Sequence, residues 1–435
     1  MRYDSIVIGS GLSGLTCALL LARIGRKVLV LEKHPAPAPV VSGFQRGGSY
    51  FDSGFHYVGG LGEGGAFQPL FRHLGLTERL KLFPFAERDF DQLRISATGE
   101  TLALPVGFTA IKAELGKRFP GVRERIENYL DEVERRWCDF PYLDLDVDIA
   151  DFAIESVHGQ SLADRLAEFV DYPELQGLLS MHSLLYGIDP REASTTLNAQ
   201  VAGSYYHSVH GIVGGGKALS EGLLALLNEA GAEVRCRAEV SQLLVSDGKI
   251  AGVRLENGEE VCATEVVATL NPTLLPQLLP EGVLRPAYLK RLHNLRQTSS
   301  AFILFGKVPR PIDLLRQRNL FVQPQAGVLC PAAELPLEQR SFYLAAADQG
   351  GRKEDNGVIG IVPARYAEVA EFADTNRRCS AGYKELKQQL TKRLLALFEE
   401  SCPELSGLQP LELATPLTLH DYSTAPGGAI YGVAR

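Results

Sequence analysis

The sequence predicts an α/β fold in which a discontinuous Rossmann-type domain with a β-meander is combined with an inserted α+β domain. Three observations predict it. A β-branched run, a glycine-rich turn, an apolar helix and a second strand follow one another within residues 4–32. A further helix, a strand and two hairpin signals lie within residues 214–264. Other material stands between these two stretches, so the Rossmann-type domain must be assembled from separate segments.

The N-terminal stretch has the order strand, turn, helix, strand. Asp4 to Ile8 is a short β-branched strand, and Leu15 to Gly25 has the leucines and alanines of a buried helix. Lys27 to Leu31 forms the second strand, which ends at Glu32, 18 residues after Gly14. This order, with an acid at the end of the second strand, is typical of a domain that binds an adenine dinucleotide.

The turn between the first strand and the helix carries the pattern G-x-G-x-x-G. Gly9 permits the tight turn, Gly11 lets the backbone approach a diphosphate, and Gly14 lets the helix pack on the strand. A carboxylate at Glu32 would bind the ribose and repel a 2′-phosphate, which disfavours NADP and leaves FAD and NAD. The residues expected to bind the dinucleotide are Gly9, Ser10, Gly11, Leu12, Ser13, Gly14 and Glu32.

The same domain is expected to continue after residue 210. A helical pattern runs from Gly214 to a cap at Gly231, and a strand follows at Glu233 to Cys236. Two turn signals then tie three strands into a meander, and one more apolar strand follows. These four strands are Val240 to Val245, Ile250 to Leu255, Glu260 to Thr264 and Glu265 to Thr269.

We therefore assign residues 1–90 and 211–275, with 415–435, to the dinucleotide-binding domain, and residues 91–210 and 276–414 to a substrate-binding domain. A net charge of −8 without a basic cluster argues against nucleic acid as a partner. The seven scattered cysteines include no C-x-x-C pair, which favours a cytoplasmic location and no metal site. No segment approaches the ~20 apolar residues of a spanning helix, so any membrane contact is expected to be peripheral.

The glycine pattern occurs a second time, at Gly60, Gly62 and Gly65. A second nucleotide loop would need a long helix next, yet residues 66–74 offer a short one with a proline near its start. It would also need a second strand ending in an acid, and residues 82–85 are broken by a proline. We predict that these glycines instead let the chain turn closely over a ligand.

Several segments together resemble the FAD-dependent phytoene desaturase, carotenoid isomerase and retinol saturase superfamily, whose wider fold is shared with flavin amine oxidases. They are the N-terminal unit, the turn FDSG at 51–54, GGGKALSEGLLALLNEAGAEV from 214, EVVATLNP from 265 and TAPGGAIYG from 424. The resemblance implies FAD as the cofactor, with the backbone at Val240 against its adenine. It also adds Lys33, Gly54 and Phe55 to the cofactor-binding residues.

The resemblance further implies that His56 and Tyr57 reach the flavin ring, and we take both as candidate catalytic residues. His56 titrates near neutrality and could donate or remove a proton beside flavin N5; the alternative is a histidine packed for structure alone. The implied activity is hydride transfer between N5 and an apolar polyene or isoprenoid, which makes, saturates or isomerises a double bond. Two alternatives stay open: a non-catalytic prenyl-lipid escort protein, and an amine oxidase, which would need an aromatic cage.

Two departures from the resembled pattern stand out. Ala38-Pro39 replaces a Gly-Gly pair, so close backbone approach to the diphosphate is expected to be lost there. The glycine-rich stretch and acid that follow the YG segment in the family have no counterpart after Gly432, so the sequence is expected to be a fragment or to lack part of the cofactor site. Apolar helices between residues 152 and 188 would serve either as plain core or as the roof of a substrate tunnel.

Overall fold

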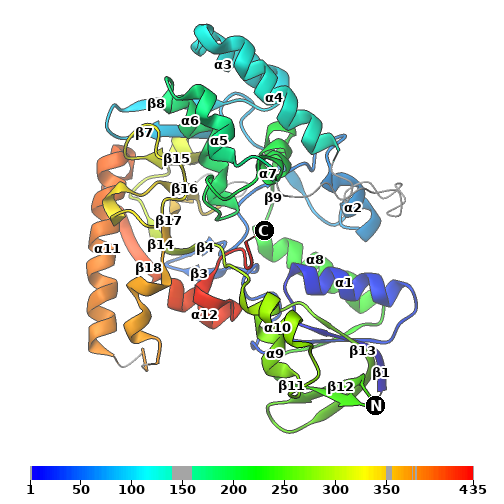
Figure 1. Cartoon of the computed structure of the whole chain (residues 1–435). Coiled ribbons are helices and arrows are strands. Elements are labelled where there is room, and N and C mark those ends of the chain that lie inside the picture. The colour runs from blue at the N-terminus through cyan, green and yellow to red at the C-terminus, as the bar shows by residue number, and fades with distance from the viewer. Residues whose placement is uncertain (1, 140–158, 349–354, 375, 378–379, 435) are drawn as a thin grey trace.

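The computed structural model describes residues 2–139, 159–348, 355–374, 376–377 and 380–434. Figure 1 shows two sheets in separate halves of the molecule, with the N-terminus in the half that contains α1 and α8. The fold is α/β, as predicted, and each half has its own apolar core. The domain limits drawn from the sequence remain a proposal.

The first half contains a six-stranded sheet in the order β10-β2-β1-β13-β12-β11. Its strands β10, β2, β1 and β13 are parallel neighbours, and β11, β12 and β13 form the antiparallel meander. Helices α1 (Leu12–Arg23) and α8 (Gly215–Glu229) share one core cluster with the buried strand residues Val7, Val28 and Val30. The strands are β1 (Arg2–Ile8), β2 (Val28–Leu31), β10 (Glu233–Arg235), β11 (Val240–Ser246), β12 (Lys249–Leu255) and β13 (Glu260–Ala268).

One boundary prediction was wrong. The two strands expected at 260–264 and 265–269 are the single strand β13. No turn residue separates Thr264 from Glu265, so the chain runs straight from one partner to the next. Residues 260–262 pair with β12, whereas 262–268 pair with β1. β13 thereby joins the meander to the parallel part of the sheet.

The second half contains a seven-stranded sheet in the order β18-β14-β17-β16-β15-β7-β8. Alternate residues of one strand face opposite layers, as a pleated strand requires. On β16, Phe342 and Leu344 pack with the long helix α11 (Ala381–Ser401), whereas Tyr343 and Ala345 face the opposite cluster. The strands are β7 (Asp91–Ile95), β8 (Glu100–Leu104), β14 (Ser300–Lys307), β15 (Asn319–Gln323), β16 (Phe342–Ala346), β17 (Gly357–Ala364) and β18 (Gln409–Ala414).

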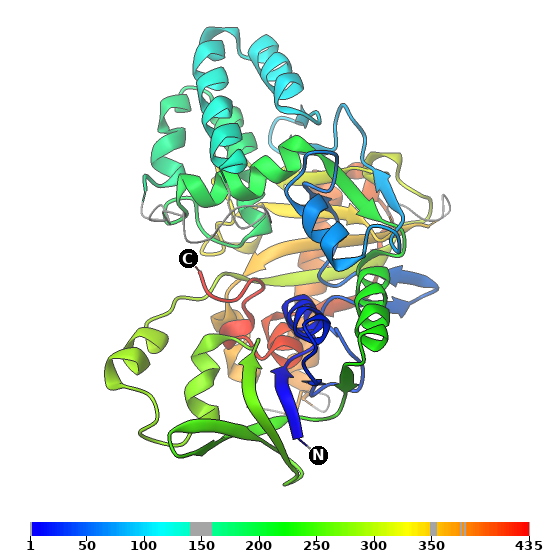
Figure 2. The same cartoon turned by 90° about the vertical axis from the view of Figure 1, so that its right-hand side faces the viewer.

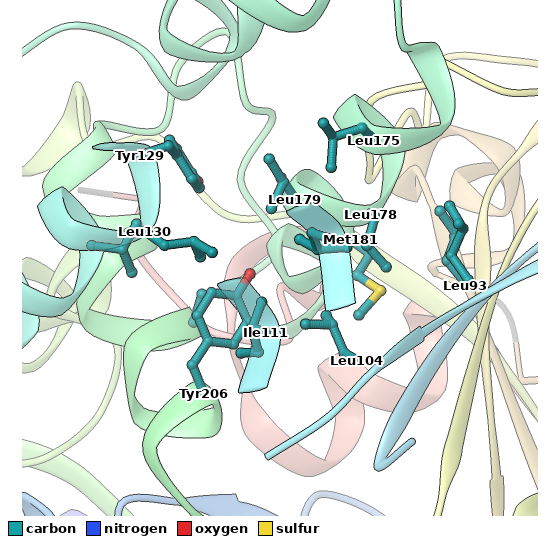
Figure 3. Close-up of a cluster of buried hydrophobic side chains, with 14 of the residues drawn as sticks. Leu93, Leu104, Ile111, Tyr129, Leu130, Leu175, Leu178, Leu179, Met181 and Tyr206 are labelled. Carbon is teal, nitrogen blue, oxygen red and sulfur yellow. The ribbon is translucent and has the colours of Figure 1, made fainter. Parts of the chain in front are cut away.

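The face of this sheet opposite α11 is covered by a helical layer, whose core appears in Figure 3. Of the leucines in the apolar helices expected between residues 152 and 188, four lie in this core with no exposed surface, namely Leu162, Leu166, Leu178 and Leu179. Leu184 and Leu185 are partly buried and pack against it, and Phe152 falls outside the described residues. A role for them as a tunnel roof stays a prediction. The helices of this layer are α3 (Phe108–Arg118), α4 (Arg123–Cys138), α5 (Leu162–Leu166), α6 (Pro173–Ser180) and α7 (Thr195–His207).

Smaller elements connect the two halves. Two small sheets are formed by β3 (Phe44–Arg46) with β4 (Ser49–Phe51), and by β5 (Val58–Gly59), β9 (Val209–Ile212) and β6 (Leu82–Pro84). The remaining helices are α2 (Phe67–Leu74), α9 (Leu275–Leu278), α10 (Pro286–His293) and α12 (Pro416–Ser423). In the part of the chain that the structure describes, no helix has the length and apolar character needed to cross a membrane.

Candidate functional site

The first glycine loop connects β1 to α1 and is closed on one side and open on the other. Gly9 has φ +100°, and its N–H donates to the carbonyl of Leu31 at 2.8 Å. A Cβ on Gly14 would lie 2.1 Å from the carbonyl oxygen of Gly9, so only glycine lets the helix pack this closely. A Cβ on Gly11 would meet no atom within 4 Å. The open side therefore lies at the N-terminus of α1, where no side chain caps the N–H groups.

Glu32 stands beside this loop and is nearly buried, with 5% of its surface exposed. Its carboxylate accepts hydrogen bonds from the Ser10 N–H at 3.0 Å, the Ser10 hydroxyl at 2.5 Å and the His34 N–H at 2.9 Å. The Ser10 hydroxyl in turn accepts from the Ala38 N–H at 2.9 Å. An ionised carboxylate offers about four acceptor positions, so one remains for a ribose hydroxyl. The open loop and this free position fit an adenine dinucleotide.

The predicted turn at 51–54 contacts the second helix of this half. Asp52 accepts a hydrogen bond from the Gly216 N–H at 2.9 Å, so the protein's own carboxylate occupies the N-terminus of α8. Burial raises the pKa of Asp52 to about 7. A Cβ on Gly54 would lie 2.8 Å from the Val40 carbonyl, and Phe55 packs against the cluster that contains α1 and α8. Of these two helix N-termini, only that of α1 is left open for an anion.

The other predicted cofactor-binding residues lie at the edges of this region. The Lys33 ammonium donates to the Asp421 carbonyl at 3.3 Å, which ties the end of β2 to α12. Val240 begins β11 and is buried in the cluster on the meander side. Leu12 is partly buried and Ser13 is exposed. Their contacts with FAD stay predictions.

His56 and Tyr57 have different surroundings. Tyr57 is buried, its hydroxyl donates to Asp91 at 2.9 Å, and burial together with Asp91 raises its pKa well above 10. His56 is partly buried and makes no hydrogen bond to any residue that the structure describes. Burial lowers the pKa of His56 to about 4, so its imidazole is neutral at pH 7. An unpartnered neutral imidazole can accept or donate a hydrogen bond to a ligand.

Sequence reasoning missed a buried polar network behind Tyr57. Asp91 accepts from the Asn319 amide at 2.8 Å and lies 2.8 Å from Nε2 of His182. Asn319 also accepts from the Tyr343 hydroxyl at 2.7 Å. Asp91, His182 and Asn319 have no exposed surface. These residues come from strands and turns far apart in the chain, and no spacing in the sequence signals that they meet.

Three tyrosines form an aromatic wall beside this network, which we call the tyrosine wall: Tyr57, Tyr205 and Tyr343. The ring centroids of Tyr57 and Tyr205 are 4.6 Å apart, and those of Tyr57 and Tyr343 are 6.3 Å apart. The His56 ring lies 5.8 Å from that of Tyr343. The sequence alone did not locate such an aromatic group. Among the described residues, no set of three or more His, Cys, Asp and Glu side chains is arranged to hold a metal ion.

Comparisons with known proteins agree with this geometry. The family model of the flavin containing amine oxidoreductases matches residues 12–351. All-trans-retinol 13,14-reductase of Danio rerio is 27% identical, over 99% of this chain and 77% of that protein. Chloroplastic prolycopene isomerase of Daucus carota is 26% identical, over 61% of this chain and 46% of that protein. The crystal structure of an oxidoreductase from Methanosarcina mazei superposes with a TM-score of 0.65 at 15% identity, over 95% of this chain and 87% of that one.

The matched family covers well over half of the chain, and its members carry a flavin. A flavin combined with a site for a diphosphate and an adenosine ribose is FAD rather than FMN. The open first loop and the free acceptor position on Glu32 fit such a site. The chain therefore belongs to the flavin containing amine oxidoreductase family and is an FAD-dependent oxidoreductase.

Proposed function

We propose that this oxidoreductase acts on an apolar polyene of the retinoid or carotenoid type, and that it makes, saturates or isomerises a carbon–carbon double bond. Bound FAD supplies the hydride chemistry at N5 of its ring. The similarity to a retinol reductase and a prolycopene isomerase supports this substrate class. The observation that carries the proposal is the unpartnered imidazole of His56 beside the tyrosine wall.

The wall suits an apolar ligand because two of its three hydroxyls are already hydrogen-bonded to the protein. The hydroxyls of Tyr57 and Tyr343 donate to Asp91 and Asn319, so the rings offer carbon surface to a neighbour. An apolar chain placed over these two rings leaves neither hydroxyl without a partner. We propose that Tyr57 positions the substrate, while His56 holds or transfers the proton that accompanies hydride movement.

Substitution of His56 tests the role of its imidazole. His56→Ala should slow polyene-dependent reoxidation of the reduced enzyme by roughly 100-fold, the usual contribution of a general acid or base. Tyr57→Phe keeps the ring and should change the rate only a few-fold. Both variants should retain FAD, which the flavin absorbance of the purified protein measures. Unchanged reoxidation of His56→Ala in anaerobic stopped-flow experiments would remove His56 from the mechanism.

The pH profile gives a second test of the same residue. The pKa of His56 is lowered from 6.5 to about 4, so the neutral form persists as pH falls through 6.5 and is lost only near 4. Titration of His56 should therefore cause no change in the reoxidation rate between pH 6 and 8. A decline with a midpoint near the ordinary histidine pKa, absent in His56→Gln, would contradict the proposed state of the imidazole.

Amine oxidation is the second candidate, favoured by the grouping of three tyrosines that an aromatic cage requires. Bleaching of the flavin by a simple diamine under anaerobic conditions, with no response to polyenes, would select it. The escort-protein hypothesis is set aside, because the chain belongs to a family of oxidoreductases. Apolar polyenes partition into membranes, so we also propose that the enzyme meets its substrate by peripheral membrane contact. A cytoplasmic location stays a prediction.

A further inference from the structure

The segment between Asn271 and Gln297, which we call the basic hairpin, carries a positive charge in a chain that is negative overall. It contains four Lys and Arg residues and one acid, a net charge of +3 in a chain whose net charge is −8. Arg296 pairs with Glu192 at 2.5 Å. The other three cations, Arg285, Lys290 and Arg291, form no ion pair with any residue that the structure describes. They are free to meet an anionic partner.

The same segment exposes apolar side chains among these cations. Val283, Tyr288 and Leu289 are 43%, 43% and 37% exposed, and they lie within seven consecutive positions. In α10 only Leu292 is buried. Exposed apolar residues and unpaired cations on one element are the two features that a segment lying in the interface of a membrane combines. Tyrosine is at its most favourable there, with its ring in the apolar layer and its hydroxyl in water.

The basic hairpin is held in place by a hydrogen bond and by apolar packing. Its base is closed by a hydrogen bond from the Asn271 amide to the Gln297 side chain at 2.7 Å. Leu275, Leu278 and Leu279 hold α9 against the meander cluster, so α10 is carried at a fixed place. Figure 2 shows the α9–α10 segment projecting from the side of the molecule, beneath the C-terminus. The projecting end can reach a flat surface without a change in the fold.

The dimensions favour a membrane over a protein partner. An eight-residue helix is only about 12 Å long. Its exposed face is therefore much smaller than the roughly 800 Å² that each partner contributes to a stable protein interface. A few inserted side chains combined with three cations suffice for reversible binding to an anionic bilayer, since each cation near such a surface contributes about a fivefold increase in partitioning. We propose that the basic hairpin docks this protein on anionic phospholipid membranes. This inference goes beyond the proposed reaction and does not depend on its substrate.

Vesicle sedimentation tests the proposal with the full-length, FAD-loaded protein. Vesicles of phosphatidylcholine with 30% phosphatidylserine should bind the protein, and vesicles of phosphatidylcholine alone should bind it far less. The triple variant Arg285→Gln/Lys290→Gln/Arg291→Gln should reduce partitioning onto the anionic vesicles about 100-fold. Tyr288→Ser/Leu289→Ser should weaken binding to the same vesicles by removing the inserted groups.

A control variant removes two exposed cations elsewhere. Lys117→Gln/Lys392→Gln should bind anionic vesicles like the parent protein, because both lysines lie outside the basic hairpin. Flavin absorbance and melting temperature should be unchanged in every variant, which separates lost docking from lost folding. Equal binding of the triple variant and the parent would overturn the proposal. Binding of the parent to neither kind of vesicle would also overturn it, and would point to an acidic protein as the partner.

Discussion

Residues 9–14 and 60–65 carry the same glycine pattern, and both turns close in the same way. The first glycine of each has a positive φ, +100° at Gly9 and +73° at Gly60. A Cβ on the last glycine would collide with the carbonyl of the first: 2.1 Å for Gly14 and 2.3 Å for Gly65. The pattern therefore specifies a turn in which the sixth residue packs on the first, whatever the turn binds.

The middle glycine separates the two turns. A Cβ on Gly11 would meet nothing within 4 Å, whereas one on Gly62 would lie 2.8 Å from Cβ of Ser208. The Gly62 N–H donates to the Ser208 hydroxyl at 3.0 Å, and the Gly60 N–H donates to the Ser208 carbonyl at 3.0 Å. The Gly9 N–H of the first turn also donates to a carbonyl, so the difference lies at the middle glycine, whose N–H the protein itself occupies in the second turn.

The strands and helices that flank the two turns also differ. The first turn joins a strand within a parallel sheet to a 12-residue helix, and the second joins the two-residue strand β5 to the eight-residue helix α2. These differences support the view that the second turn is not a nucleotide loop, which stays a prediction. A glycine motif alone indicates backbone shape, and its surroundings decide whether a ligand can enter.

The largest expected effect comes from the last glycine of each turn. Gly14→Ala and Gly65→Ala introduce the same collision with a carbonyl, so both should lower the melting temperature by several degrees. Only Gly14→Ala should also lower FAD affinity, by about 100-fold or more, because it shifts the open loop and the start of α1. FAD titration and thermal melting of the two variants measure this contrast. Loss of FAD from a folded Gly65→Ala protein would show that the second turn also contacts the cofactor.

The middle glycines should give opposite results in the two turns. Gly11→Ala fits the protein without a collision, so the melting temperature of the FAD-free form should hold while FAD affinity falls, by roughly tenfold or more. Gly62→Ala should lower the melting temperature and leave FAD affinity within about twofold of the parent. The comparison would fail if Gly11→Ala destabilised the FAD-free protein as much as Gly62→Ala does.

A smaller effect is expected from one acid beside each turn. Glu32→Gln places an amide where two donors of Ser10 and one of His34 point, and it removes the charge that we predict binds the ribose. FAD affinity should fall roughly tenfold, as for loss of a hydrogen bond to a charged group. Glu63→Gln in the second turn should leave FAD affinity unchanged. Parallel titrations of the two variants measure the difference, and equal affinities would remove Glu32 from the ribose site.

The sequence predicted the first half, which contains the six-stranded sheet, well because its signals are local. Strand, glycine turn, helix and acid follow one another within residues 4–32, and NG and DG turns mark the meander. The second half was predicted only in outline. Its strands β7 and β15 are parallel neighbours separated by more than 200 residues, and no local signal encodes such a pairing.

The same reason explains what was missed at the site. His56 and Tyr57 were found through a resemblance, but Asp91, His182 and Asn319 meet only after two strands and a turn assemble. Their network is nevertheless what fixes the Tyr57 hydroxyl beside His56, whose imidazole makes no hydrogen bond to a described residue. Single polar residues within apolar strands carry no periodic signal, although buried polar residues must find partners once the core forms.

The smallest expected effect concerns Ala38, where the family pattern has glycine. Ala38 is fully buried with φ +50°, a left-handed conformation that costs a residue with a Cβ about 1 kcal/mol. Ala38→Gly should therefore raise the free energy of unfolding by up to about 1 kcal/mol, while Ala36→Gly, which lies outside the left-handed region, should lower it slightly. Urea unfolding of both variants measures the difference.

FAD affinity separates two explanations for the position of Ala38. Its N–H already donates to the Ser10 hydroxyl, which donates to Glu32, so the backbone here supports the acid that we predict binds the ribose and is not free for a diphosphate. Ala38→Gly should consequently leave FAD affinity within about twofold of the parent, because it keeps that N–H. A clear gain in FAD affinity without a gain in stability would mean that the methyl group of Ala38 holds the diphosphate away from the backbone. The contrast between an open and an occupied backbone, seen in the two glycine turns, would then apply to the segment at Ala38 as well.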